Sequence, residues 1–142
     1  MSLIKYSFIA FLITILSSCS KYEEGPKFSF STKKSRLVGE WKLVKQTENN
    51  VEVNLENVEA SATISENGTY DLKFIVYVLG LPFTDQSEGK WKFNANKTQV
   101  IFTETGASTS SFRTIVKLAE NELKLREVNS NNNVIIAAYH PN

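Results

Sequence analysis

The sequence of 142 residues contains only one cysteine and one histidine, which excludes several classes of site. A single cysteine forms no internal disulfide framework and supplies no multi-cysteine zinc or iron–sulfur site. The one histidine, His140, is the third-last residue, so catalytic triads and histidine-based metal sites lack a central component. We therefore expect no catalytic residues, no metal site and no cofactor.

The sequence also lacks an excess of charge of one sign, since 16 Lys and Arg residues are balanced by 15 Asp and Glu residues. Nucleic-acid binding needs a clustered basic surface, so we expect no nucleic-acid partner. Glycoside hydrolysis would need two facing carboxylates. Glu40, Glu59, Asp71 and Glu88 fall on the polar sides of their runs, and Glu104 shares a face with Phe102 but has no inward carboxylate partner.

A long hydrophobic run is missing as well. The apolar run at residues 6–16 has eleven residues, well short of the roughly 20 that cross a bilayer. It follows Lys5 and has the length of the hydrophobic region of a secretory signal peptide. Leu16-Ser17-Ser18-Cys19 then resembles the lipobox of bacterial lipoproteins, in which a diacylglycerol is attached to the cysteine before cleavage just ahead of it. The alternative is an ordinary signal peptide with a chance cysteine near its cleavage site.

The lipobox interpretation divides the chain into three parts. Residues 1–18 are a lipoprotein signal peptide, residues 19–35 are the lipidated Cys19 with a flexible tether, and residues 36–142 are a folded domain. Several acyl chains on one residue anchor a protein stably to a membrane. The resemblance therefore implies a lipid-anchored protein of the cell envelope, at the outer membrane, on its periplasmic or its surface face.

The tether is charged and serine-rich, and Gly25-Pro26 breaks any regular structure in it. Glu23-Glu24, close behind Cys19, resembles the acidic export signal of surface lipoproteins in Bacteroidota. The alternative interpretation treats both glutamates as part of a solvated linker.

From Leu37 onward, hydrophobic residues recur with a period close to two, and turn residues interrupt them at intervals of roughly 8 to 15 positions. Glu66-Asn67-Gly68 carries the Asn-Gly signature of a hairpin turn. No stretch prefers a helix. The pattern predicts eight strands, at residues 37–46, 57–65, 69–78, 85–94, 98–105, 110–118, 122–128 and 134–140.

Consecutive hairpins of this kind form a meander, which either closes on itself or leaves two exposed edges. Closure at eight strands gives a barrel wide enough for one small ligand. We therefore predict an all-β fold, an eight-stranded antiparallel up-and-down barrel. An open two-sheet sandwich is the alternative.

The first predicted strand carries a family resemblance. Arg36-Leu37-Val38-Gly39-Glu40-Trp41-Lys42-Leu43 resembles the opening of lipocalins, in which Gly-x-Trp starts the first strand. The resemblance implies that Trp41, beside Gly39, plugs the closed end of the barrel, and that Arg126 or Lys124 packs over its ring. With the lipobox and the tether, the whole chain resembles the lipocalin-like lipoproteins of Bacteroidota.

Two functions are compatible with such a barrel. In the first, which the resemblance favours, it binds a small hydrophobic ligand in a cavity lined by Trp41, Tyr70, Leu72, Phe74, Trp91, Phe93, Phe102 and Phe112. In the second, these side chains fill a packed core, and the protein is a structural or protein-interaction module of the cell envelope. It would then use its outer surface, where Ile75, Tyr77, Leu79 and Leu81 could form an apolar patch. An open cavity of roughly 300 Å³ or more would favour the first function.

Overall fold

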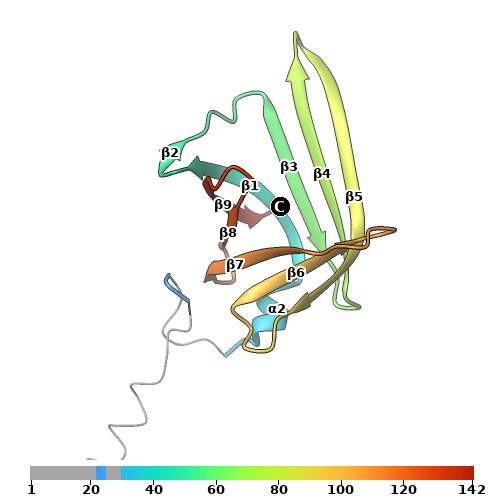
Figure 1. Ribbon diagram of the computed structural model, residues 1–142, viewed down its shortest axis with the longest axis vertical. Coiled ribbons are helices and arrows are strands. Elements are labelled where there is room, and N and C mark those ends of the chain that lie inside the picture. Colours follow the sequence, from blue (N-terminus) through green and yellow to red (C-terminus); the bar gives the residue numbers. More distant parts are fainter. Residues whose placement is uncertain (1–21, 25–29) are drawn as a thin grey trace, which may run out of the picture.

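Nine strands and one short helix make up the part of the chain that the computed structural model describes, residues 22–24 and 30–142 (Figure 1). The predicted signal peptide and Cys19 lie outside these residues. The elements are α2 (Lys33–Leu37), β1 (Gly39–Glu48), β2 (Val51–Glu52), β3 (Val58–Ile64), β4 (Thr69–Val78), β5 (Leu81–Phe93), β6 (Gln99–Glu104), β7 (Ser111–Leu118), β8 (Leu123–Val128) and β9 (Val134–Pro141).

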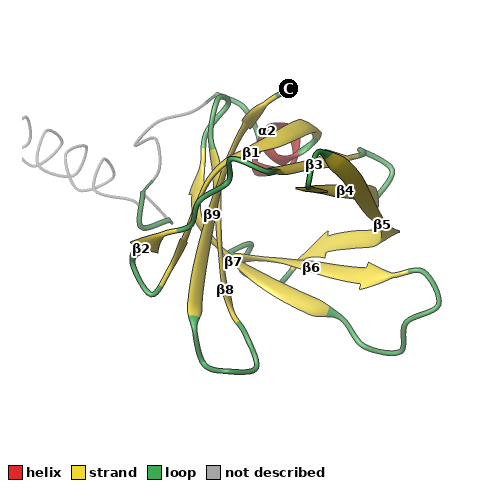
Figure 2. Ribbon diagram, turned by 90° about the horizontal axis from the view of Figure 1, so that it is seen from above, coloured by secondary structure: helices red, strands yellow, loops and turns green. Residues whose placement is uncertain are grey.

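The strands form one closed antiparallel barrel. Neighbours pair in the order β2-β1-β3-β4-β5-β6-β7-β8-β9, and β1 also pairs with β9. This last pairing joins β1 and β3–β9 into a ring of eight strands, which Figure 2 shows from above. The predicted eight-stranded up-and-down barrel is therefore confirmed, and the open sandwich is not formed.

Two elements were not expected from the sequence. β2 is a two-residue strand that pairs back on the end of β1. Helix α2 begins inside the segment predicted to be tether, and the Thr32 side chain caps it by accepting a hydrogen bond from the backbone N–H of Ser35 at 3.1 Å. Leu37, at the end of α2, is fully buried, so tertiary packing stabilises a helix too short to be signalled by its own periodicity.

The β4–β5 hairpin is longer than predicted. Leu79 and Gly80 form its turn with φ angles of +52° and +79°, so β5 begins at Leu81 and not at the predicted Asp85. β4 pairs with β5 along its whole length, but β6 pairs with β5 only from Gly89 to Phe93. Residues 81–87 of β5 therefore have a strand partner on one side only, where Pro82 is tolerated.

The hydrophobic core fills the end of the barrel beside α2. Leu37, Val100 and Leu118 have no exposed surface. The two indoles bury their rings with the N–H satisfied: Trp41 Nε1 donates to the carbonyl of Leu37 and Trp91 Nε1 to the carbonyl of Ser65, both at 2.9 Å. The barrel interior is thus filled at this end, and open space inside it lies toward the other. Within residues 22–24 and 30–142, no helix is long and apolar enough to span a bilayer.

Candidate functional site

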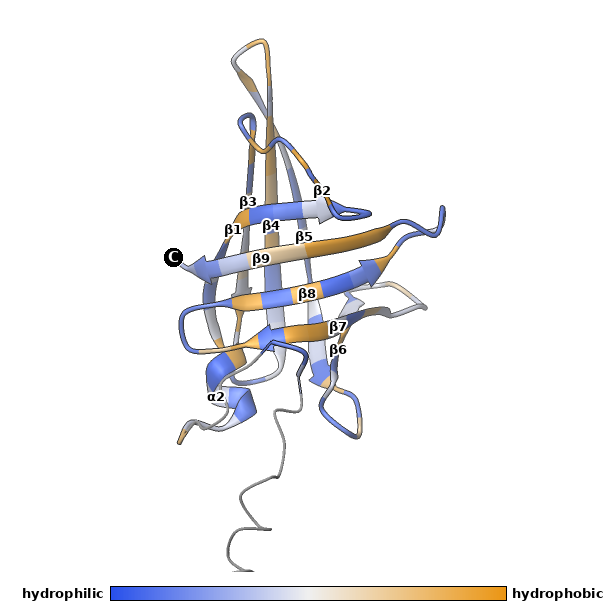
Figure 3. Cartoon of the chain, turned by 90° about the vertical axis from the view of Figure 1, so that its left-hand side faces the viewer, coloured by the Kyte–Doolittle hydropathy of each residue, from blue (hydrophilic) through white to orange (hydrophobic). Residues whose placement is uncertain are grey.

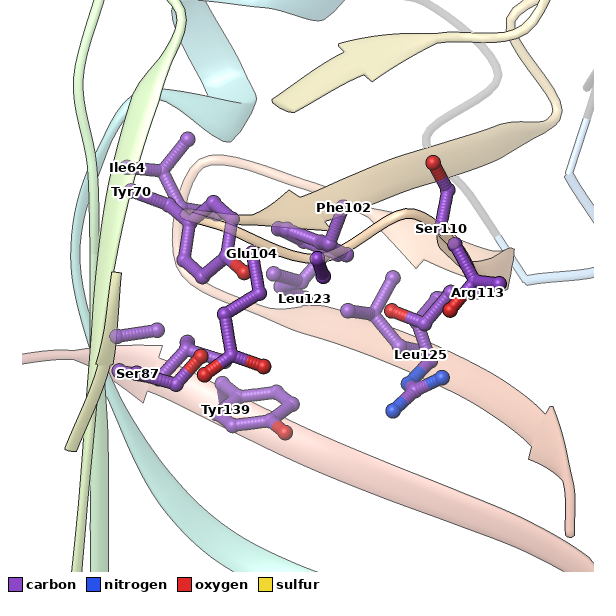
Figure 4. A pocket seen from close by; sticks show the side chains of 15 residues that line it. Ile64, Tyr70, Ser87, Phe102, Glu104, Ser110, Arg113, Leu123, Leu125 and Tyr139 are labelled. Carbon is purple, nitrogen blue, oxygen red and sulfur yellow. The ribbon is translucent and has the colours of Figure 1, made fainter. Parts of the chain in front are cut away.

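A cavity of about 390 Å³ lies inside the barrel, beyond the packed core (Figure 4). Seven strands, β3 to β9, supply its wall together with the β6–β7 loop, because alternate residues of each strand point inward. β5 and β9 contribute one residue each. The apolar part of the wall consists of Ala62, Ile64, Tyr70, Leu72, Phe102, Ala107, Leu123 and Leu125. The polar part consists of Ser87, Glu104, Thr109, Ser110, Ser111, Arg113 and Tyr139.

The aromatic wall of the cavity is built around a glycine. Tyr70 and Phe102 pack edge to face with ring centroids 5.0 Å apart. The residue opposite Tyr70 on β5 is Gly89, which lies in turn opposite Glu104 on β6. A Cβ at Gly89 would lie 2.1 Å from the carbonyl oxygen of Thr103, so only glycine allows β6 to approach β5 this closely.

The charged groups at the cavity are one ion pair and one further carboxylate. Arg113 Nη2 lies 2.8 Å from Glu127 Oε2, and both side chains are partly exposed. Glu104 forms no salt bridge with any residue in the described ranges, and it is exposed at the end of β6. The guanidinium is neutralised by its partner, so the carboxylate of Glu104 gives this end of the barrel a negative charge.

Tyr139 brings a phenol into the same cavity, from the last strand. Its hydroxyl has no hydrogen-bond partner among residues 22–24 and 30–142. Burial raises the pKa of Tyr139, the nearby Arg113 lowers it, and Glu127 raises it. The phenol is therefore protonated at neutral pH, and its oxygen is available to accept or donate one hydrogen bond to a ligand.

Three of the eight predicted lining residues, Tyr70, Leu72 and Phe102, line this cavity. Trp41 and Trp91 belong to the core beneath it, and Phe93 packs against that core, with its ring 5.5 Å from the ring of Trp91. Phe74 lies on β4 outside the cavity wall and is 43% exposed. The indoles and Phe93 therefore close the barrel and do not contact a ligand at this position.

Phe112 lies on the outside of the barrel, contrary to its prediction as a cavity residue. It is opposite Ile101 in the β6–β7 register and is 55% exposed. The prediction assumed that inward and outward residues alternate without interruption from Phe112 to Leu118. A bulge between Ile115 and Lys117 instead adds one residue to β7. Because of this extra residue, the residues before the bulge face the opposite way from the prediction, so Arg113 and not Phe112 faces the cavity.

The predicted closing motif is present only in part. Trp41 is 3% exposed and sits at the closed end, next to Gly39, whose φ of +151° favours glycine. Arg126 does not pack over this ring. Leu123 and Leu125 point into the barrel, so Arg126 and Lys124, which alternate with them, point outward, away from Trp41.

Arg126 and Lys124 instead hold the short described segment 22–24 against the outer wall. Arg126 pairs with Glu23, and Lys124 Nζ lies 2.5 Å from Glu24 Oε2. The backbone N–H of Glu24 donates to the carbonyl of Val116 at 2.8 Å, and the Tyr22 hydroxyl donates to the carbonyl of Lys97 at 2.8 Å. Figure 3 faces this wall of β7, β8 and β9. The two glutamates thus lie on the barrel and not in an undocked linker.

The polar cavity residues, Glu104 and Tyr139 among them, were not assigned to the site from the sequence. Glu104 was recognised as sharing a face with Phe102, but no partner suggested a role for it. Tyr139 follows Ile135-Ile136-Ala137-Ala138, where both faces of the strand are apolar, so alternation could not select the inward side. Within the described part of the chain, no three His, Cys, Asp or Glu side chains gather in a way that could hold a metal ion.

Comparison with known proteins gives a family and a fold. A family model described as a lipocalin-like domain matches residues 37–125. No curated protein sequence matches the chain. A redesigned β-barrel of 14% identity superposes with a TM-score of 0.50, over 81% of this chain and 99% of that one, and this similarity shows the barrel fold.

Bovine odorant-binding protein is also similar at the level of structure. Its complex with its natural ligand is 14% identical, with a TM-score of 0.48, and covers 81% of this chain and 77% of that one. Its complex with undecanal has the same identity, coverage and TM-score.

Proposed function

Because the chain belongs to the lipocalin-like domain family, we propose that it binds a small hydrophobic molecule inside its barrel. The observation that carries this proposal is the cavity of about 390 Å³ above the packed core. Its volume falls within the range of roughly 300 to 1,000 Å³ that is typical of small-molecule sites. Its wall combines aliphatic and aromatic side chains with a few polar groups, which is the composition of a site that orients an apolar ligand.

The cavity also favours binding over the filled-core function. Protein interiors are packed about as densely as organic crystals, and a void lined by apolar side chains costs stability in proportion to its volume. The core around Leu37, Val100 and Leu118 is packed in this way, whereas the space between Tyr70, Leu125 and Tyr139 is open. An apolar ligand in that space would recover the contacts that the void lacks.

Titration of the full chain with N-phenyl-1-naphthylamine, a neutral apolar fluorophore, tests the proposal. We expect saturable binding of one fluorophore per chain. Leu72→Trp should abolish it, because Leu72 lines the cavity at a position exposed enough to accept a larger side chain. Phe112→Trp, on the outer face, is the matched control and should bind as the parent does.

The proposal is wrong if the parent chain shows no saturable binding. It is also wrong if Leu72→Trp binds the fluorophore as tightly as Phe112→Trp, because the fluorophore would then sit outside the cavity. Circular dichroism of both variants establishes that each retains its β-sheet content.

The sequence of residues 16–19 supports a second proposal, on location. A diacylglycerol on Cys19 would anchor the barrel to a membrane of the cell envelope, at the outer membrane of a member of the Bacteroidota, on the periplasmic or the surface face. Hydrocarbon chains contribute about 0.8 kcal/mol per buried CH₂ group, so several chains on one residue suffice for a stable anchor.

A second candidate function uses the free edge of β5. Residues 81–87 lack a partner strand on the β6 side, and Leu81 and Phe83 on this edge are about 60% exposed. An extended strand from a partner protein could pair there by main-chain hydrogen bonds. Of the apolar patch predicted from the sequence, Leu79 and Leu81 are exposed, whereas Ile75 and Tyr77 are partly buried. Leu72→Trp separates the two functions, since it fills the cavity and lies on β4 away from Leu81 and Phe83.

A further inference from the structure

We propose that the ligand of the cavity is an apolar amine, whose protonated nitrogen is held by Glu104 at the cavity mouth. The inference rests on the proposed function, because it names the chemical class of the molecule that the barrel binds. Charged, aromatic and hydrogen-bonding groups converge on one end of the cavity.

Glu104 is placed to receive a cation. It is the last residue of β6, on the same face as Val100 and Phe102, so its side chain points to the inside of the barrel at the open end. Figure 4 shows its carboxylate extending into the cavity on the side of Ser87 and Tyr139. No lysine or arginine among the described residues pairs with it, so a ligand cation meets no competing protein cation.

The other charges at the cavity disfavour an anionic ligand. Arg113 is the cationic side chain in the wall, and it already pairs with Glu127 at 2.8 Å. A ligand carboxylate would have to compete with Glu127 for this guanidinium and would also approach Glu104. Like charges placed close together are costly, so the arrangement selects against fatty-acid-like ligands.

The aromatic, hydroxyl and aliphatic groups of the cavity wall also suit an apolar amine. The rings of Tyr70, Phe102 and Tyr139 line the cavity, and aromatic faces attract a neighbouring ammonium group. The Tyr139 oxygen can accept one of the three N–H donors of a primary ammonium. Deeper in the wall, Ile64, Leu123 and Leu125 offer an apolar surface for a hydrocarbon chain or ring.

Calorimetric titration of the full chain with three ligands of equal length tests the inference. The ligands are decylammonium, decan-1-ol and decanoate, at neutral pH, low salt and below micellar concentrations. We expect decylammonium to bind about fivefold more tightly than decan-1-ol, as for a partly exposed ion pair, and decanoate to bind most weakly. Added salt should reduce the advantage of the ammonium ligand.

Glu104→Gln should remove the difference between the ammonium ligand and the alcohol while leaving the affinity for the alcohol within about twofold. Glu88→Gln is the matched control, because Glu88 is exposed on the outer side of the neighbouring strand and should leave the order of affinities unchanged. Both substitutions remove one negative charge, so a general effect of net charge would appear in both variants.

The outcomes separate this inference from the proposed function. If the three ligands bind equally, or decanoate binds most tightly, the barrel binds hydrophobic molecules, but the proposal that its ligand is an amine is wrong. If decylammonium is preferred and Glu104→Gln keeps that preference, the assignment of Glu104 is overturned. If none of the three ligands binds, the proposed function fails together with the inference.

Discussion

Arg126 and Glu23, 103 residues apart in the sequence, form a two-point salt bridge on the outer wall of the barrel. Arg126 Nη1 lies 2.8 Å from Glu23 Oε1, and Nη2 lies 2.5 Å from Oε2. Next to it, Glu24 is held through both its carboxylate and its backbone N–H. These contacts fix residues 23 and 24 to β7 and β8. Because four residues span at most about 14 Å, a lipid on Cys19 would hold this wall close to the membrane.

Loss of the guanidinium should release the segment. In Arg126→Ala we expect the amide of Glu24, which donates to Val116, to exchange its hydrogen about fivefold faster, as for the loss of one exposed ion pair. Hydrogen exchange followed by NMR measures this rate. Lys45→Ala removes another surface ion pair, with Glu52 at a distant site, and should leave the Glu24 rate unchanged. An unchanged rate in Arg126→Ala would show that the backbone bond holds the segment alone.

The same contact should depend on pH. The hydrogen bonds from Arg126 lower the pKa of Glu23, desolvation raises it, and the charge of Arg126 lowers it further. A carboxyl group with a lowered pKa in the folded state stabilises that state above its unfolded pKa, and the effect disappears as the pH falls through the folded pKa. We therefore expect the segment to be docked at neutral pH and released in acid. Carboxyl-carbon NMR titration should give Glu23 a lower midpoint in the parent than in Arg126→Ala, and equal midpoints would contradict the contact.

Residues 115–117 of β7 show where prediction from the sequence succeeded and where it failed. The strands could be predicted because alternation is a local property that each strand carries by itself. The bulge at Val116 could not, since one extra residue leaves the composition of the strand unchanged while it moves Phe112 outward and Arg113 inward. The pairing of Arg126 with Glu23 was also hidden, because nothing near either residue in the sequence indicates a partner so far away.

The sequence predicted a cavity inside the barrel but identified only some of the residues that line it. Tyr70, Leu72 and Phe102 could be assigned to the inside by alternation alone. Whether an inward aromatic residue lines a void or fills the core depends on how far along the barrel it lies, and this depends on the tertiary pairing. Trp41 and Trp91 are inward but lie at the packed end, so alternation could not separate them from the cavity wall.

Truncating a side chain to alanine should lower the free energy of unfolding far more on the inner side of β7 than on its outer side. Leu118 is fully buried in the core, and Leu118→Ala should lower the free energy of unfolding by about 2 to 5 kcal/mol, from lost burial and the cavity left behind. Phe112 is 55% exposed on the outer face, and Phe112→Ala should lower it by less than about 1 kcal/mol. Urea denaturation of the full chain measures both values. Similar losses for the two variants would contradict the outward placement of Phe112.

The proposed membrane location depends on Cys19, whose sulfur is the predicted site of the lipid. In Cys19→Ala the thioether cannot form, so we expect the chain either to leave the membrane fraction or to accumulate with residues 1–18 still attached. Fractionation of the producing bacterium, followed by mass spectrometry of the intact protein, measures both outcomes. Ser20→Ala is the matched control, because it changes the neighbouring residue without removing the sulfur. Normal processing and full membrane retention of Cys19→Ala would show that the membrane is reached without a lipid on this residue.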